Sequence, residues 1–195
     1  MGFWTEAYRS SPPWDIGRPQ PVFEELVRKG ELNPGTVLDV GCGTGENSLF
    51  LAQNGFTVTG VDITPTAIRV AKAKAVERKI KVDFRVGNAL SLDLKQGQFS
   101  NVIDSGLFHT FTDADRPVYV GEIRRVLQIG GNYFMMCFCD KEPTDWGGPR
   151  RVSKQEILES FSPSFKINFV REARFATKIQ DVGGLTYLTS ATKAK

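Results

Sequence analysis

The chain contains few of the residues that build metal centres or disulfide frameworks. Its 195 residues include one histidine and three cysteines, and Cys42, Cys137 and Cys139 show no C-x-x-C spacing. An odd number of widely spaced cysteines favours free, buried thiols in a reducing compartment. With a single imidazole as well, we expect no metal site.

Long apolar runs and strong charge are also missing. No apolar run is long enough to cross a bilayer, and no charged-then-apolar start with a cleavage site is present. We therefore expect a cytosolic (cytoplasmic) protein with no membrane partner. The net charge is only +3 and the basic residues are dispersed, which argues against nucleic acid as a partner. With 41% apolar residues, residues 1–195 suit a single α/β domain.

The most informative stretch is a glycine turn between two predicted strands. Residues 36–40 are an apolar strand pattern, glycines follow at Gly41, Gly43 and Gly45, and a second strand ends at Asp62. A buried strand, a glycine turn that opens a helix and an acid after the next strand are typical of a nucleotide-binding βαβ unit.

One glycine of the dinucleotide pattern is absent. G-x-G-x-x-G would place its third glycine at position 46, but Glu46 stands there, and Asp39 precedes the turn. Carboxylates at both places would repel a pyrophosphate, whereas they suit a ligand with a positive end. Asp62 is placed to accept hydrogen bonds from both ribose hydroxyls, while the turn lets the backbone approach a nucleoside closely.

The run Val37-Leu38-Asp39-Val40-Gly41-Cys42-Gly43-Thr44-Gly45 resembles the first motif of the class I S-adenosylmethionine-dependent methyltransferases. Their cofactor carries an ammonium, a sulfonium, a ribose and an adenine, but no phosphate. The resemblance implies a Rossmann-like, doubly wound α/β fold, with a seven-stranded, mostly parallel sheet and one antiparallel strand. It implies a core over residues 36–192 and S-adenosyl-L-methionine as cofactor.

Residues 1–20 are rich in both aromatic residues and prolines. The segment is too aromatic to be a disordered tail and too proline-rich to be a helix. The run Pro12-Pro13-Trp14-Asp15-Ile16-Gly17-Arg18-Pro19 resembles the N-terminal segment of the thiopurine and halide/thiol methyltransferase branch. There a similar segment closes the active site, so the resemblance implies a lid over the cofactor. The alternative is that Trp4 and Trp14 simply pack on the outside of the sheet.

The remaining elements follow from apolar periodicity and from start and stop signals. We expect helices at 21–29 and 46–54, a helix that begins at Pro65 with Thr64 as its cap, a helix at 113–127, and one behind a capping box of Ser153 and Glu156. Strands are expected at 82–86, 99–105, 133–138, 166–171 and 185–192, the last pair as a hairpin.

Candidate site residues lie where strands end, because ligands bind at the carboxyl edge of an open parallel sheet. Asn88 stands where the resembling enzymes usually carry an acid that reads the adenine amino group, and it can still accept that bond or else cap a turn. The expected cofactor-binding residues are Trp14, Arg18, Asp39, Gly41, Gly43, Gly45, Asp62, Ile63, Asn88, Ala89, Asp104 and Ser105. The expected substrate-side residues are Trp14, Phe108 and Trp146.

His109 is the candidate catalytic residue. Methyl transfer can rest on proximity and removal of water, helped by an aromatic wall near the sulfonium. A neutral hydroxyl or amine acceptor needs a base, and His109 is the only imidazole. A thiol that ionises in the site needs none, and His109 is then a structural residue.

Three functions remain open from the sequence. The first is a methyltransferase that acts on a sulfur, nitrogen or oxygen atom of a small molecule, working as a monomer or homodimer. A nucleic-acid acceptor is disfavoured. Enzymes that methylate amino groups of nucleic acids resemble one another in an Asp/Asn-Pro-Pro-Tyr/Phe tetrad after the fourth strand, and this chain has Asp104-Ser105-Gly106-Leu107 there. The others are a nicotinamide-dependent oxidoreductase, which Glu46 opposes, and a cofactor-binding protein without turnover.

Overall fold

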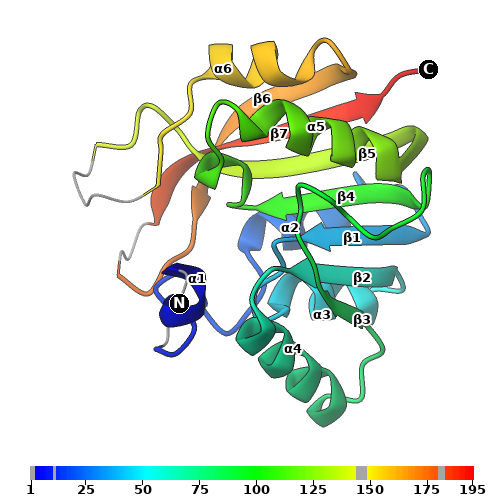
Figure 1. Ribbon diagram of the computed structural model, residues 1–195, viewed down its shortest axis with the longest axis vertical. Coiled ribbons are helices and arrows are strands. Elements are labelled where there is room, and N and C mark those ends of the chain that lie inside the picture. Colours follow the sequence, from blue (N-terminus) through cyan, green and yellow to red (C-terminus); the bar gives the residue numbers. More distant parts are fainter. Residues whose placement is uncertain (1–2, 11, 144–148, 180–182) are drawn as a thin grey trace.

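The chain folds around one seven-stranded sheet with the strand order β3-β2-β1-β4-β5-β7-β6 (Figure 1). The computed structural model describes residues 3–10, 12–143, 149–179 and 183–195. The strands are β1 Thr36–Val40, β2 Thr57–Asp62, β3 Asp83–Val86, β4 Phe99–Ser105, β5 Leu127–Phe138, β6 Phe165–Phe175 and β7 Gly184–Lys193. β7 runs antiparallel to both of its neighbours, and the pairs among β1 to β5 are parallel. The predicted fold class is confirmed.

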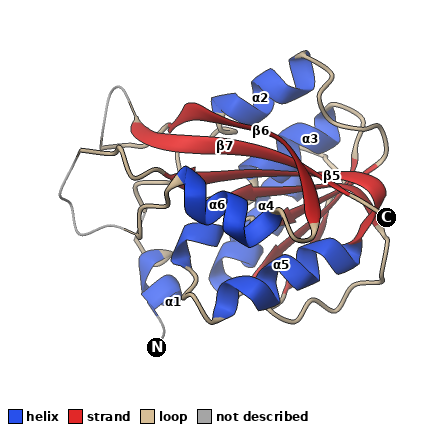
Figure 2. Cartoon of the chain, turned by 90° about the horizontal axis from the view of Figure 1, so that it is seen from above, coloured by secondary structure: helices blue, strands red, loops and turns tan. Residues whose placement is uncertain are grey.

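Helices cover both faces of the sheet (Figure 2). They are α1 Phe3–Ala7, α2 Pro21–Arg28, α3 Glu46–Gln53, α4 Pro65–Glu77, the 3₁₀ helix η1 Phe108–Thr110, α5 Asp115–Val126 and α6 Lys154–Phe161. Alternation along β1 shows why two layers form: Val37 packs with α2 and α3, whereas Leu38 packs with α5 and α6. Both core clusters are continuous across several strands, so apolar burial on both faces supports the sheet.

Local signals place most helix starts correctly. Ser153 and Glu156 form the predicted capping box, with the Ser153 hydroxyl accepting from the Glu156 backbone N–H. α4 begins at Pro65 as predicted, but the Thr64 side chain makes no capping hydrogen bond. The prediction that the N-terminal segment is too proline-rich for a helix is wrong for its first residues, because α1 ends before the prolines begin.

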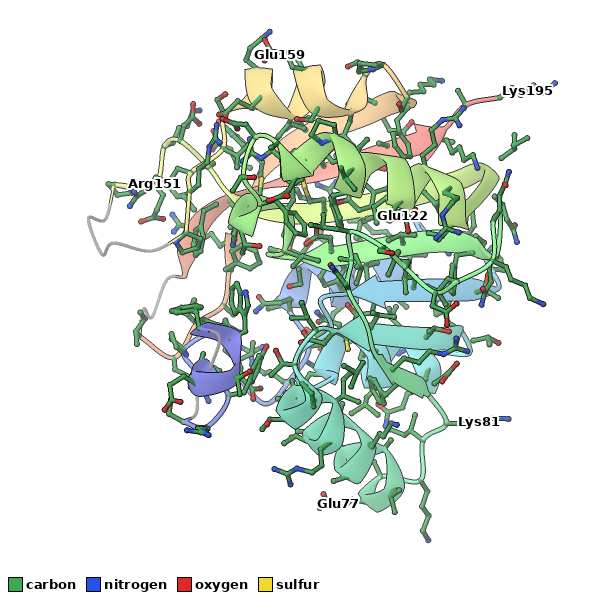
Figure 3. All side chains as sticks on the ribbon, viewed as in Figure 1. Glu77, Lys81, Glu122, Arg151, Glu159 and Lys195 are labelled. Atoms are coloured by element: carbon green, nitrogen blue, oxygen red, sulfur yellow. The ribbon has the colours of Figure 1, made fainter. Side chains whose placement is uncertain are left out.

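Charged side chains of both signs lie on the described surface. Glu77, Lys81 and Glu159 point away from the ribbon on different sides of the molecule (Figure 3). Cys42, Cys137 and Cys139 are free and buried, as predicted. Within the part of the chain that the structure describes, no helix is long and apolar enough to cross a membrane.

Candidate active site

A cavity of about 790 Å³ opens at the carboxyl ends of the parallel strands. The glycine turn, the ends of β2 and β4 and the segment after β3 form one part of its wall. The rest comes from the N-terminal segment, from η1 and the two residues after it, from the end of β5, from residues 149–150, and from the end of β6 with the residues that follow it. In Figure 1, α1 lies beyond the ends to which β1 and β4 point. The cavity is therefore at the edge that the topology predicts for ligands.

The predicted residues divide into three groups. Those that line the cavity are Trp14, Arg18, Gly41, Gly43, Gly45, Asp62, Ile63, Asn88, Ala89, Ser105 and His109. Asp39, Asp104 and Phe108 are buried elsewhere. Trp146 lies outside the described residues.

The glycine turn is held so close to the core that side chains are excluded. The backbone N–H groups of Gly41 and Cys42 both donate to the Val61 carbonyl, at 2.8 and 3.0 Å. Gly45 has φ +85°, and a Cβ there would lie 2.6 Å from the Phe84 ring. Glycine is required at this position by both backbone conformation and packing.

Asp62 is fixed at the end of β2 by two backbone donors. Its Oδ2 accepts from Gly43 N at 2.9 Å and its Oδ1 from Thr64 N at 2.8 Å. Burial raises the pKa of Asp62, and the two N–H bonds oppose that rise. Each oxygen keeps a further lone pair, so this oriented carboxylate can accept hydrogen bonds from a ligand in the cavity.

Asp39 and Asp104 do not reach the cavity, which corrects their assignment to the cofactor. Asp39 is fully buried and accepts from the Ser48 hydroxyl at 2.6 Å. Asp104 accepts from two backbone N–H groups and from the hydroxyls of Tyr119 and Tyr133. Burial raises the pKa of Asp39 to about 7 and that of Asp104 to about 6. Within the described residues, both carboxylates accept hydrogen bonds from groups in the protein interior and do not line the cavity.

Glu46 lines the cavity but does not offer it a free negative charge. Its carboxylate forms a two-pronged pair with Arg78, at 2.7 and 2.9 Å, and a 2.9 Å ion pair with Lys74. Burial alone would raise the pKa of Glu46, yet the hydrogen bonds from both cations lower it. The prediction that Glu46 favours a ligand with a positive end is therefore wrong, because Lys74 and Arg78 neutralise this acid.

Asn88 and Phe108 show how neighbouring contacts decide a role. The Asn88 side-chain oxygen accepts from Leu90 N at 3.0 Å, so Asn88 caps a turn, as the alternative prediction had it. Asn88 also lines the cavity. The Phe108 ring is completely buried, 5.1 Å from the Phe161 ring and 4.6 Å from the Arg116 guanidinium. Phe108 is therefore a core residue, which corrects its substrate-side assignment.

His109 lies against the cavity in a tight aromatic setting. Its ring stacks on Phe138 at 5.2 Å and meets the edge of Phe175 at 6.1 Å. Its Nδ1 accepts a hydrogen bond from the Phe138 backbone N–H at 3.1 Å. Burial, together with the charge of Arg116, lowers the pKa of His109 to about 3.

The N-terminal segment is attached to two separate walls of the cavity. On the glycine-turn side, the Thr44 hydroxyl donates to Asp15 at 3.0 Å. On the β6 side, Lys178 N donates to the Pro13 carbonyl at 2.9 Å. Gln20 joins both sides, because its backbone N–H donates to Asn47 and its side chain forms two hydrogen bonds with the Ala176 backbone.

Several cavity residues escaped prediction. Tyr8 places its hydroxyl over Gly43, where an added Cβ would lie 2.6 Å away, and accepts from Trp14 Nε1 at 3.3 Å. Phe138 and Phe175 are the last residues of β5 and β6. The strand-end rule that indicated Ser105 could have indicated these two as well.

Comparisons with known proteins agree with this arrangement. A methyltransferase domain model matches residues 37–131. A 2-heptyl-1-hydroxyquinolin-4(1H)-one methyltransferase of Mycobacteroides abscessus is 38% identical over 87% of this chain and 75% of its own length. A probable thiol methyltransferase 2 of Arabidopsis thaliana is 32% identical over 83% of this chain and 72% of its own.

Among solved structures, one described as "Conversion of a Disulfide Bond into a Thioacetal Group during Echinomycin Biosynthesis" superposes with a TM-score of 0.88. It is 30% identical and covers 98% of this chain and 91% of its own. The glycine turn, the strand order and these relatives give one answer: the chain belongs to the class I S-adenosylmethionine-dependent methyltransferases.

Proposed function

We propose that the cavity holds S-adenosylmethionine and a small aromatic methyl acceptor side by side. The observation that carries this proposal is the division of the cavity wall. One part consists of the glycine turn and Asp62, and the other is largely aromatic, with Trp14, Phe138 and Phe175. When bound, S-adenosylmethionine supplies an activated methyl group.

The residues of the first part fit this cofactor. The glycines of the turn line the cavity and carry no side chains, so a nucleoside can approach the backbone closely. Asp62 accepts from the ribose hydroxyls, with its orientation set by Gly43 N and Thr64 N. Asn88 and Ala89 lie beside the adenine, and the second lone pair of the Asn88 oxygen accepts from the adenine amino group. Ile63 and Ser105 complete this wall, and Arg18, exposed at the cavity, pairs with the carboxylate of the cofactor.

The second part of the wall suits a planar apolar acceptor. Trp14, Phe111, Phe138 and Phe175 present ring surfaces to the cavity, and His109 adds a polar group among them. Aromatic faces also attract a sulfonium through cation–π interaction. The two relatives are named for a hydroxyquinolinone and for thiols. We therefore propose an aromatic acceptor with an acidic oxygen, sulfur or nitrogen nucleophile.

Residues 1–20 act as the lid of this site in our proposal. The support is that the segment lines the cavity while it is fastened to the glycine turn through Asp15 and to the β6 side through Pro13. A closed segment keeps water away from the reacting atoms and holds the two ligands in contact. Trp14 then serves both cofactor and acceptor. A cytosolic location and a monomeric or homodimeric state stay predictions.

Calorimetry on a pair of variants tests the cofactor assignment. Asp62→Ala removes the acceptor of the ribose hydroxyls and should weaken S-adenosylmethionine binding by about 1.5–3 kcal/mol for a charged hydrogen-bonding group. Asp83→Ala is the matched control, since Asp83 begins the adjacent strand and pairs with the exposed Arg85. Unchanged affinity in a folded Asp62→Ala protein would remove Asp62 from the site.

A methyl-transfer screen tests the acceptor class. The protein is incubated with cofactor labelled in its methyl group and with thiophenols, phenols, hydroxyquinolinones, aliphatic amines and halide ions. We expect transfer to the acidic aromatic compounds first. Transfer only to amines or halides would contradict the proposed acceptor.

A further inference from the structure

The hydrogen bond between the Phe138 backbone and His109 determines which ring nitrogen carries the proton. A backbone N–H can only donate, so Nδ1 of His109 must present its lone pair to it. A neutral imidazole has one proton, which therefore sits on Nε2. The ring stays neutral, because burial, helped by the charge of Arg116 on α5, lowers the pKa of His109 to about 3.

The Nε2–H group has no hydrogen-bond partner among the residues that the structure describes, while His109 itself lines the cavity. The His109 ring lies against the stacked ring of Phe138 and the edge of Phe175, and its Nε2 lies beside Gly106, where an added Cβ would be 3.5 Å away. Because none of these described neighbours accepts a hydrogen bond from Nε2, this N–H has to find its acceptor in a molecule that occupies the cavity, or in water.

We propose that His109 is a hydrogen-bond donor to the methyl acceptor, through Nε2–H, and that the enzyme selects acceptors whose nucleophile arrives already deprotonated. This inference rests on the proposed function and deepens it. Nδ1 is occupied and Nε2 already bears a proton, so neither nitrogen can take a proton from the acceptor. When an anionic acceptor bonds to the methyl carbon, the sulfur–methyl bond of the sulfonium breaks and its electron pair stays on sulfur. Both products, the methylated acceptor and the thioether S-adenosylhomocysteine, are then neutral at the reacting atoms, so no proton remains for the protein to remove.

The substrate class follows from this assignment. The site takes aromatic thiolates and acidic N-hydroxy or hydroxy heteroaromatic anions, because each offers a lone pair to His109 and a second one to the methyl group. Ordinary phenols, which ionise near pH 10 as tyrosine does, react only through their small anionic fraction. Aliphatic alcohols are excluded.

The tautomer can be measured without any substrate. The chain has one histidine, so protein labelled with ¹⁵N-histidine yields one pair of ring-nitrogen signals in a long-range ¹H–¹⁵N spectrum. We expect a protonated Nε2 and a bare Nδ1, unchanged over about pH 5 to 8, with S-adenosylhomocysteine bound. A proton on Nδ1, or titration within that range, would overturn the proposal.

Two substitutions separate a donor from a base. His109→Gln retains an amide N–H near the Nε2 position, and His109→Phe retains only the ring. With thiophenol as acceptor, the Phe variant should lose about 10- to 100-fold in kcat/KM, the usual worth of a hydrogen bond to a charged group, and the Gln variant should lose less. If His109 were a base for phenol, both variants would lose about 10²- to 10⁴-fold with phenol, and the wild-type phenol rate would not follow phenol ionisation.

The outcomes keep the two proposals apart. S-adenosylmethionine affinity, measured in both variants, reports that the cofactor half of the site is intact. Equal, undiminished thiophenol rates in both variants would make His109 structural and overturn the donor role. If neither acceptor is methylated by wild type, the proposed acceptor class fails, and the ¹⁵N spectrum still decides the tautomer.

Discussion

Substituting alanine at two glycines of the same turn should have different consequences, and this contrast tests how the turn is built. Both residues have positive φ, +54° at Gly43 and +85° at Gly45. At Gly45 a Cβ would lie 2.6 Å from the Phe84 ring and 2.9 Å from Ala71 Cβ. At Gly43 it would lie 2.6 Å from the Tyr8 hydroxyl.

The magnitudes follow from what each new methyl group meets. A left-handed conformation costs a non-glycine residue about 1–2 kcal/mol, and this applies to both variants. Phe84 and Ala71 are buried in a core cluster and cannot move aside, so Gly45→Ala adds an overpacking cost of about 1–3 kcal/mol. We expect Gly45→Ala to lower the free energy of unfolding by about 2–5 kcal/mol and Gly43→Ala by about 1–2 kcal/mol.

Gly43→Ala should instead displace the N-terminal segment, since Tyr8 belongs to it. Urea unfolding measures the first effect, and limited proteolysis within residues 1–20 measures the second. Adding Tyr8→Phe removes the clashing oxygen and leaves the ring carbon at 3.5 Å, an ordinary contact, so the double variant should recover protection from proteolysis. Equal destabilisation by the two alanines, or no recovery in the double variant, would refute this reasoning.

Two further predictions concern Asp39 and the lid. Burial raises the pKa of Asp39 from 3.8 in the unfolded chain to about 7, so the folded protein holds a proton that the unfolded chain has lost, and wild-type stability declines as pH rises through this window. Asp39→Asn cannot titrate, so its unfolding free energy relative to wild type should be higher at pH 8 than at pH 5, and a difference independent of pH would count against a buried, protonated Asp39. Deleting residues 1–18 should leave a folded domain that binds S-adenosylmethionine less tightly and turns over far more slowly. An insoluble or molten product would instead show that these residues are core, and full activity would exclude a lid.

The residue order determined the elements around the glycine turn. The strand before it, the helix that opens at Glu46 and the strand that ends at Asp62 were predictable, since each rests on a local signal: an apolar run, a glycine pattern or a strand end. The capping box of Ser153 is local in the same way. The seven-stranded sheet with one antiparallel strand was implied by the family resemblance and agrees with the structure, whereas the order of its strands comes from the structure alone.

Only the tertiary structure decided which polar and aromatic groups face the cavity. Asp39 and Asp62 are both acids beside the glycine turn, but packing buries the first against Ser48 and leaves the second at the wall. The charge of Glu46 is neutralised by Lys74 on α4 and by Arg78 directly after it, which are far from Glu46 in the sequence.

The same holds for the adjacent pair Phe108 and His109, one in the core and one at the cavity. The proton of His109 is placed by a backbone group of β5, which is 29 positions away in the sequence. Local pattern governs backbone conformation, because it depends on neighbours within a few residues. The direction, charge and proton of a side chain depend on groups that only folding brings into contact.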